Sequence, residues 1–187
     1  MTTGEFGGLS NMAPNFPLRV NGISIASTEA LYQACRFPDQ PDVQAMIIDQ
    51  RSPMTAKMKS KRYRKDTRSD WDQLRVKIMR WCLRVKLAQN WSSFSGLLLK
   101  TGTRPIVEES QKDAFWGAKP KDDGMLVGMN VLGRLLMELR QELHLDQDKL
   151  KMVEPPSIPN FLLLGKPVRR IGAHELGVTS FQSSMFN

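Results

Sequence analysis

The chain of 187 residues has little cysteine and histidine and no long hydrophobic run. Its two cysteines, Cys35 and Cys82, and its two histidines, His144 and His174, lack the spacings typical of zinc sites, so we predict neither metal nor cofactor. No stretch approaches the ~20 apolar residues that cross a bilayer, and the N-terminus lacks a basic and apolar leader. We therefore expect a cytoplasmic protein that binds no membrane and whose two thiols are buried and inert.

Composition and length predict one soluble globular domain. The hydrophobic share of 41% and the charged share of 25% are ordinary for such domains, and 187 residues suffice for one core but not comfortably for two. We divide the chain into a domain over residues 1–147 and a C-terminal extension of unknown role over residues 148–187. In the extension, Pro155, Pro156 and Pro159 form a stiff connector.

Positive charge is concentrated in one segment. Between Arg51 and Lys86, thirteen Lys or Arg stand against three Asp, a net charge of +10 where the whole chain carries +8. Such a block favours an anionic partner, either nucleic acid or a phosphorylated metabolite, through an attraction that salt screens. Five of the cations lie between Lys61 and Arg68, with Tyr63 among them to stack on a base. A solvated basic face without function is the alternative.

Periodicity predicts an α+β fold that is predominantly helical, with a few short strands. Asn21–Gly22 indicates a tight hairpin turn between two apolar strands, and residues 105–109 have the pattern of another short strand. Ser27 or Thr28 is expected to cap a helix over residues 29–37. Further helices are expected over residues 42–50, 92–100 and 128–144, with one more opening at Pro53 and a long one starting from Ser69 or Asp70.

Eight motifs stand in the order in which they occur in the NADAR (YbiA-like) family. They are GEFGGLSNMAP, STEALYQACRF, SPMTAKMKSK, DWDQLRVKIMRWCLRVKLAQN, LLLKTG, PIVEES, DAFWGA and GMNVLGRLLMELR. The chain resembles this family from about Gly4 to Arg140, roughly three quarters of its length. The resemblance implies a single compact NADAR domain with a pocket between its helices, and an N-glycosidase that acts on ribose-containing compounds.

The resemblance implies two substrate classes, both of them ADP-ribose-containing or phosphorylated nucleotides. One consists of phosphorylated intermediates of riboflavin biosynthesis. The other is ADP-ribose attached to guanine bases of nucleic acid, with ADP-ribosylated DNA and a cognate ADP-ribosyltransferase as partners. We favour the second class, in which the enzyme reverses ADP-ribosylation. A module that binds ADP-ribose or nucleic acid without cleaving it is a further alternative.

Two carboxylates are candidates for the chemistry of cleaving a ribose C1–N bond, which passes through an oxocarbenium-like state. Glu29 matches the family's TEALYQ-type motif at a helix start, where the helix dipole favours its ionised form. Asp113 precedes Phe115-Trp116-Gly117, again as in the family. Trp116 would stack on a base, with Gly117 beside it as a further substrate-binding residue, while Asp113 binds ribose hydroxyls or activates water. A first-turn glutamate and an aspartate that caps a turn are the purely structural alternatives.

Amides and cations complete the predicted site. Asn11 and Asn130 match family motif positions and can fix ribose or phosphate oxygens, or act as plain caps. Relatives often have lysine where this chain has Arg36, and a lysine imine with the opened ribose has been proposed for the family. Arginine cannot form that imine, so we assign Arg36 to a phosphate. Lys57 is the first candidate for an imine and Lys59 the second, because cationic surroundings raise the free-amine fraction of a lysine.

Overall fold

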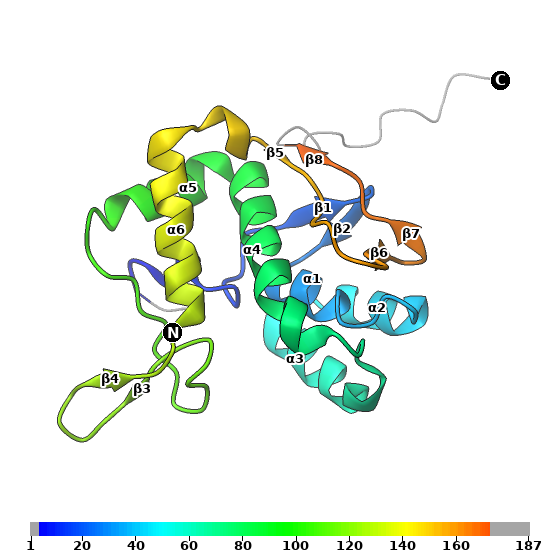
Figure 1. Cartoon of the computed structure of the whole chain (residues 1–187), viewed down its shortest axis with the longest axis horizontal. Helices are drawn as coiled ribbons and strands as arrows, with labels where there is room; N and C mark the ends of the chain where they lie inside the picture. The colour runs from blue at the N-terminus through cyan, green and yellow to red at the C-terminus, as the bar shows by residue number, and fades with distance from the viewer. Residues whose placement is uncertain (1–3, 173–187) are drawn as a thin grey trace.

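A computed structural model describes residues 4–172. Its body is made of α-helices, with short strands at the periphery (Figure 1). The helices are α1 (Thr28–Ala34), α2 (Pro41–Ile48), α3 (Pro53–Arg62), α4 (Trp71–Gln89), α5 (Trp91–Lys100) and α6 (Val131–Leu145). Three 3-10 turns accompany them, η1 (Gly7–Leu9), η2 (Arg64–Asp66) and η3 (Asp148–Leu150).

The strands pair into antiparallel two-stranded ribbons. These are β1 (Leu18–Val20) with β2 (Ile23–Ile25), β3 (Lys119–Pro120) with β4 (Leu126–Val127), β5 (Met152–Val153) with β8 (Ile171–Gly172), and β6 (Leu162–Leu163) with β7 (Lys166–Pro167). The predicted fold class, α+β and mostly helical, is therefore confirmed.

Local sequence determines several element boundaries. Asn21 and Gly22 both have positive φ, at 52° and 80°, as the predicted tight turn between β1 and β2 requires. Ser27 caps α1, because its hydroxyl accepts a hydrogen bond from the backbone N–H of Ala30. Pro41 begins α2, where its missing N–H costs nothing. The helix from Ser27 ends at Ala34, three residues earlier than predicted.

The predicted strand over residues 105–109 is wrong. Only Glu109 makes a bridge there, an isolated parallel one with Ala118. The segment crosses the start of α6 instead, and the side chain of Asn130 satisfies its backbone by bonding the carbonyl of Ile106 and the N–H of Glu108. The Asn130 side chain thus supplies backbone hydrogen bonds that a neighbouring strand would otherwise have provided.

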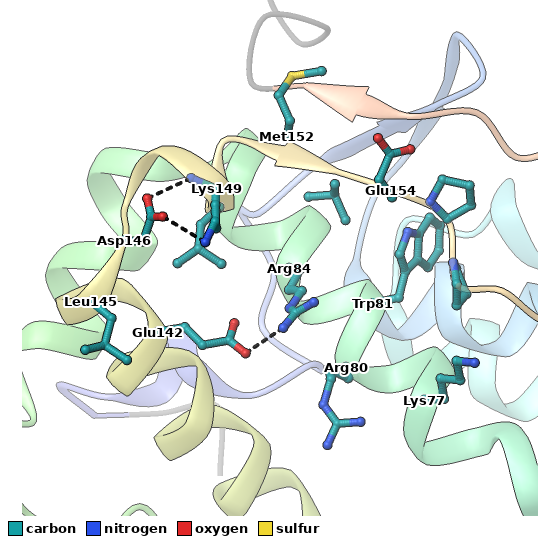
Figure 2. A pocket seen from close by; sticks show the side chains of 14 residues that line it. Lys77, Arg80, Trp81, Arg84, Glu142, Leu145, Asp146, Lys149, Met152 and Glu154 are labelled. Atoms are coloured by element: carbon teal, nitrogen blue, oxygen red, sulfur yellow. Dashed lines mark hydrogen bonds and ion pairs between the residues drawn. The ribbon is translucent and has the colours of Figure 1, made fainter.

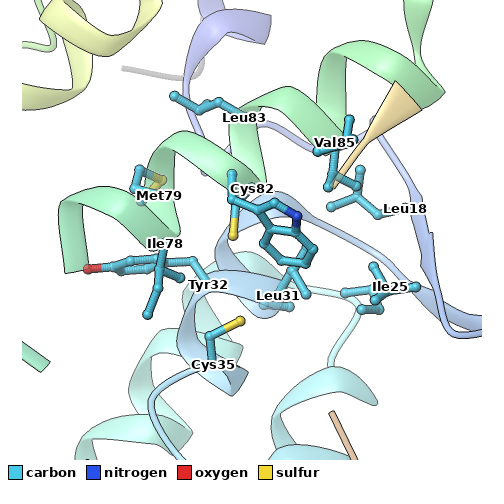
Figure 3. Packing of buried hydrophobic residues seen from close by; sticks show 14 of the residues in the cluster. Leu18, Ile25, Leu31, Tyr32, Cys35, Ile78, Met79, Cys82, Leu83 and Val85 are labelled. Carbon is cyan, nitrogen blue, oxygen red and sulfur yellow. The ribbon is translucent and has the colours of Figure 1, made fainter. Parts of the chain in front are cut away.

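Helix α4 forms the centre of the core. Its residues Ile78, Met79 and Cys82 face Tyr32 of α1 and Cys35, which directly follows α1 (Figure 3). Both cysteines are buried free thiols, as predicted. The side chains of Trp71 and Trp81 on α4 are also buried, in keeping with their helical spacing.

The segment that follows α6 packs on the same core. Phe161 meets the ring of Trp81 edge to face at 4.9 Å, and Leu163 and Ile171 lie in the main hydrophobic cluster. Buried Gln44 of α2 bonds the backbone of this segment, donating to the carbonyl of Leu162. Residues 148–172 therefore cover α2 and α4. Over residues 4–172, the structure contains no helix long and apolar enough to cross a membrane.

Candidate functional site

A cavity of about 590 Å³ opens between α1, α3, η2, the start of α4 and the loop over residues 108–117. Seven of the nine predicted site residues line this cavity. They are Asn11, Glu29, Arg36, Lys57, Asp113, Trp116 and Gly117. Lys59 and Asn130 do not line it.

Glu29 lies at the bottom of the cavity with only 2% of its surface exposed. Its Oε2 accepts a hydrogen bond from Nδ2 of Asn11, and its Oε1 accepts one of 2.8 Å from Nε2 of Gln33. Burial raises the pKa of this carboxyl, against the opposing charge of Lys57. The helix start was expected to favour the ionised form, but the cost of desolvation is larger. Glu29 is therefore a rigidly held carboxyl that retains a proton more readily than an ordinary glutamate.

A polar network extends from Glu29 to Arg36. Oε1 of Gln33 accepts hydrogen bonds from Oγ of Ser60 at 2.7 Å and from Nη1 of Arg36 at 3.2 Å. The guanidinium of Arg36 also donates to Oγ1 of Thr67 and lies 5.1 Å from the ring of Trp71. These contacts fix a positive charge in the cavity wall, where it can meet an anionic group of a substrate.

Glu108 is a second carboxyl in the cavity, and sequence reasoning missed it. It is half-buried and accepts a hydrogen bond of 3.3 Å from Oγ of Ser10. Burial raises the pKa of Glu108, and the charges of Lys57 and Lys86 oppose that rise. Glu108 and Glu109 are adjacent in an irregular segment, so no periodicity indicated which of them faces the cavity.

Lys57 of α3 lines the cavity, and its positive charge opposes the rise that burial causes in the pKa of both Glu29 and Glu108. Lys59 is two residues further along the same helix and therefore points to a different side, which explains why it does not reach the cavity. Lys61, one turn after Lys57, lines the cavity instead.

The loop before β3 supplies one wall. Oδ1 of Asp113 accepts hydrogen bonds from the N–H groups of Phe115 and Trp116, at 3.0 and 2.9 Å. Asp113 thus caps a turn and lines the cavity at once, and its negative charge contributes to the raised pKa of Glu29. The Trp116 ring meets Tyr32 edge to face at 5.6 Å.

Gly117 and Asn130 act through the backbone of this wall. A Cβ atom on Gly117 would lie 2.2 Å from the carbonyl oxygen of Glu108, so only glycine permits the contact. Asn130 has a left-handed backbone with φ of 49° and holds the segment from Ile106 to Glu108 with both ends of its amide. Asn130 does not line the cavity, and its amide holds the backbone of the segment that carries Glu108. Its predicted contact with substrate stays a prediction.

A buried lysine anchors the segment that carries Asn11. Lys86 of α4 is fully buried, and its Nζ donates hydrogen bonds to the carbonyls of Gly8 at 2.6 Å and Ser10 at 2.9 Å. The rings of Phe16 and Phe94 flank the ammonium, with centroids 4.3 and 4.4 Å away. Burial lowers the pKa of Lys86 to about 7.

A second cavity, of about 730 Å³, lies between α4, the end of α6 and residues 149–156 (Figure 2). Its charged groups are largely neutralised by each other. Arg84 pairs with Glu142 at 2.5 Å, and Lys149 pairs with Asp146 at 3.3 Å. It lacks the buried carboxyl with a raised pKa that distinguishes the first cavity, so we place the candidate active site in the first. Over residues 4–172, no group of three or more His, Cys, Asp or Glu is arranged to hold a metal ion.

Comparison with known proteins agrees with the motifs and the fold. The sequence model of the NADAR domain matches residues 2–144. The chain belongs to the NADAR family. It is 34% identical to N-glycosidase YbiA of Escherichia coli (strain K12) over 146 residues, which cover 78% of this chain and 87% of that protein. The match to a riboflavin biosynthesis protein of Vibrio vulnificus is 35% identical over 155 residues, covering 82% of this chain and 40% of that protein.

The fold of this NADAR domain also has a counterpart among solved structures. The NMR structure of YbiA from E. coli superimposes with a TM-score of 0.67 at 32% identity, covering 80% of this chain and 84% of that one. All the residues that line the candidate active-site cavity lie within the part of the chain that the NADAR model matches.

Proposed function

We propose that this chain is an N-glycosidase that removes ADP-ribose from guanine bases of nucleic acid. The observation that carries the reaction type is the buried Glu29, held by Asn11 and Gln33 at the bottom of an open cavity. Burial raises its pKa and so favours the protonated form that a general acid needs. The names of the relatives agree, since YbiA is called an N-glycosidase.

Two carboxyl groups, those of Glu29 and Asp113, carry out the proton transfers of the cleavage. When the ribose C1–N bond breaks, its electron pair stays on the base nitrogen, and Glu29 supplies the proton that this nitrogen takes up. Water then adds to C1 and gives its proton to Asp113. Positive charge develops on the sugar ring in between, and the carboxylates around the cavity stabilise it. Trp116 provides the wall against which the base rests.

The cations at the cavity support a substrate that contains a pyrophosphate. Arg36, Lys57, Lys61, Arg64 and Arg75 all line it, more positive charge than a neutral metabolite needs. A phosphorylated intermediate of riboflavin biosynthesis is the second candidate substrate, which the name of the Vibrio relative favours. A module that only binds would have no use for a carboxyl kept buried at a cost in stability.

Two incubations test the proposal. The pure protein is given single-stranded DNA with an ADP-ribosylated guanine and, separately, a phosphorylated riboflavin intermediate, and products are identified by mass spectrometry. We expect release of ADP-ribose and unmodified guanine from the DNA. If only the riboflavin intermediate is consumed, the substrate is wrong and the reaction type stands. If neither is consumed, the chain is not the N-glycosidase proposed.

An imine on Lys57 is a further expectation for this site. The amine would condense with the aldehyde of ring-opened ADP-ribose, lose water, and be reduced by borohydride to a stable secondary amine. Mass spectrometry should then show one added group on the wild-type protein and on Lys59→Arg, because Lys59 does not line the cavity. Lys57→Arg should remain unmodified. An unchanged mass of the wild type would exclude the imine from this enzyme.

A further inference from the structure

The β3–β4 hairpin stands out from the body of the molecule (Figure 1) and continues the wall that contains Trp116. Its base is tightly fixed to that wall. The N–H of Met129 bonds the carbonyl of Ala114 at 2.7 Å, and a Cβ atom on Gly128 would lie 2.4 Å from the carbonyl oxygen of Gly117. The hairpin is therefore an arm with a defined position beside the mouth of the active site.

This arm exposes an apolar surface. Met125, Leu126, Val127 and Met129 fall within five residues, and each is between 42% and 59% exposed. Single exposed apolar side chains are ordinary in soluble proteins, but four within five residues, on both faces of β4 and just beside it, indicate a contact surface. The arm's own charges balance, since Lys119 and Lys121 precede Asp122 and Asp123 in the sequence. The arm therefore carries no net charge to attract a ligand, and we expect its ligand to contact it through apolar surface.

The rim across the cavity has different chemistry. It is formed by η2 and the end of α3, which carry Lys61, Arg62, Arg64 and Lys65. Among residues 4–172, none of these four has an acidic side chain as an ion-pair partner, and Lys61 and Arg64 line the cavity itself. Their charge is available to an anionic ligand. The mouth thus lies between an apolar arm and a cationic rim.

We propose that the β3–β4 hairpin docks the unstacked bases of a single-stranded nucleic acid whose phosphates lie along the η2 rim. This inference rests on the proposed function. Because Glu29 is almost completely buried, a modified base reaches it only after leaving its stack. The neighbouring bases then expose apolar faces, and aliphatic side chains such as Met and Leu bind such faces. Lysine and arginine on the opposite rim bind the phosphates that join those bases.

A double variant tests the arm. Leu126→Thr together with Val127→Thr removes apolar surface while keeping residues that favour strands. Leu145→Gln is the matched control, because Leu145 is 77% exposed at the far end of α6. Fluorescence anisotropy measures the binding of an unmodified single-stranded 12-mer of DNA to all three proteins. In parallel, cleavage is measured with ADP-ribosylated guanine in the same 12-mer and with ADP-ribosylated free guanosine.

The double variant should bind the 12-mer about tenfold more weakly than the wild type and the control, a loss typical of removing base contacts. Its kcat/KM on the modified 12-mer should fall by a similar factor, while its kcat/KM on ADP-ribosylated free guanosine should change little. Equal affinity of the double variant and the wild type would overturn the inference. So would a wild type that does not bind the 12-mer. If neither substrate is cleaved but the arm still determines DNA binding, the proposed function fails and the arm's role stands.

Discussion

Glu29→Gln should retain substrate affinity and lose turnover by ~10²-fold or more. The amide keeps the shape of the side chain, and its single oxygen can still accept one of the two hydrogen bonds that Asn11 and Gln33 donate to Glu29, but it has no acidic proton to give to the departing base. The loss should therefore appear in kcat and leave KM largely unchanged. Steady-state kinetics on the modified oligonucleotide, with binding measured separately, checks both values.

Glu138→Gln is the control for this substitution. Glu138 lies on α6 and pairs with Arg80 at 3.0 Å on the surface, outside the active-site cavity. Its replacement should change turnover by less than about twofold, since exposed ion pairs contribute little. Near-normal turnover in Glu29→Gln would remove Glu29 from the chemistry and leave Glu108 or Asp113 as the acid.

Lys86→Met should destabilise the protein by at least about 2 kcal/mol at pH 8.5. Methionine fills a similar volume between Phe16 and Phe94, but the carbonyls of Gly8 and Ser10 then lose a buried donor. Because these residues lead into Asn11, activity should fall as well. Chemical denaturation gives the free energy of unfolding, and turnover is measured on the same preparations.

The effect should depend on pH in a defined direction. The pKa of Lys86 is about 7 in the folded protein and near the ordinary lysine value when unfolded, so above pH 7 the unfolded chain binds more protons. Wild-type stability therefore gains from Lys86 as pH rises from 7 toward 10. Between pH 6.5 and 8.5 the difference between wild type and Lys86→Met should grow by about 2 kcal/mol.

Exposed Lys149 provides the comparison. Lys149→Met removes a surface ion pair with Asp146 and should shift stability by no more than about 0.5 kcal/mol at either pH. The wild type and the Lys86→Met variant share all other titrating groups, so the difference between them reports Lys86 together with its electrostatic coupling to Glu108. A difference that stays constant from pH 6.5 to 8.5 would mean that Lys86 has the same pKa folded and unfolded.

Where the local sequence is decisive, the fold and site could be predicted. Asn21–Gly22 admits few backbones other than a tight turn, Ser27 is a strong cap, and the apolar spacing of α4 leaves no choice of buried face. Glu29 was found because it matches the family's TEALYQ-type motif at a helix start, since a glutamate in a first helical turn is by itself common. Family motifs also added Asp113, whose loop has no period of its own.

The remaining features depend on contacts between distant segments. Whether Glu108 or Glu109 faces the cavity is determined by Asn130, more than twenty residues away. In the sequence, Lys86 is one of several cations in a basic helix, and its burial follows only from the packing of η1 against it. Lys59 was proposed from its neighbours in sequence, but the turn of α3 points it elsewhere. No pattern within a single element contains this information.

The contact between Gly117 and Glu108 has a consequence for how such enzymes can diverge. Any side chain at position 117 would push the backbone of Glu108 away, so this part of the wall has no freedom to vary. The β3–β4 hairpin extends from the same wall into solvent, and its side chains can change without disturbing the core. New substrate preferences can therefore evolve on the arm while the reaction beneath it stays the same.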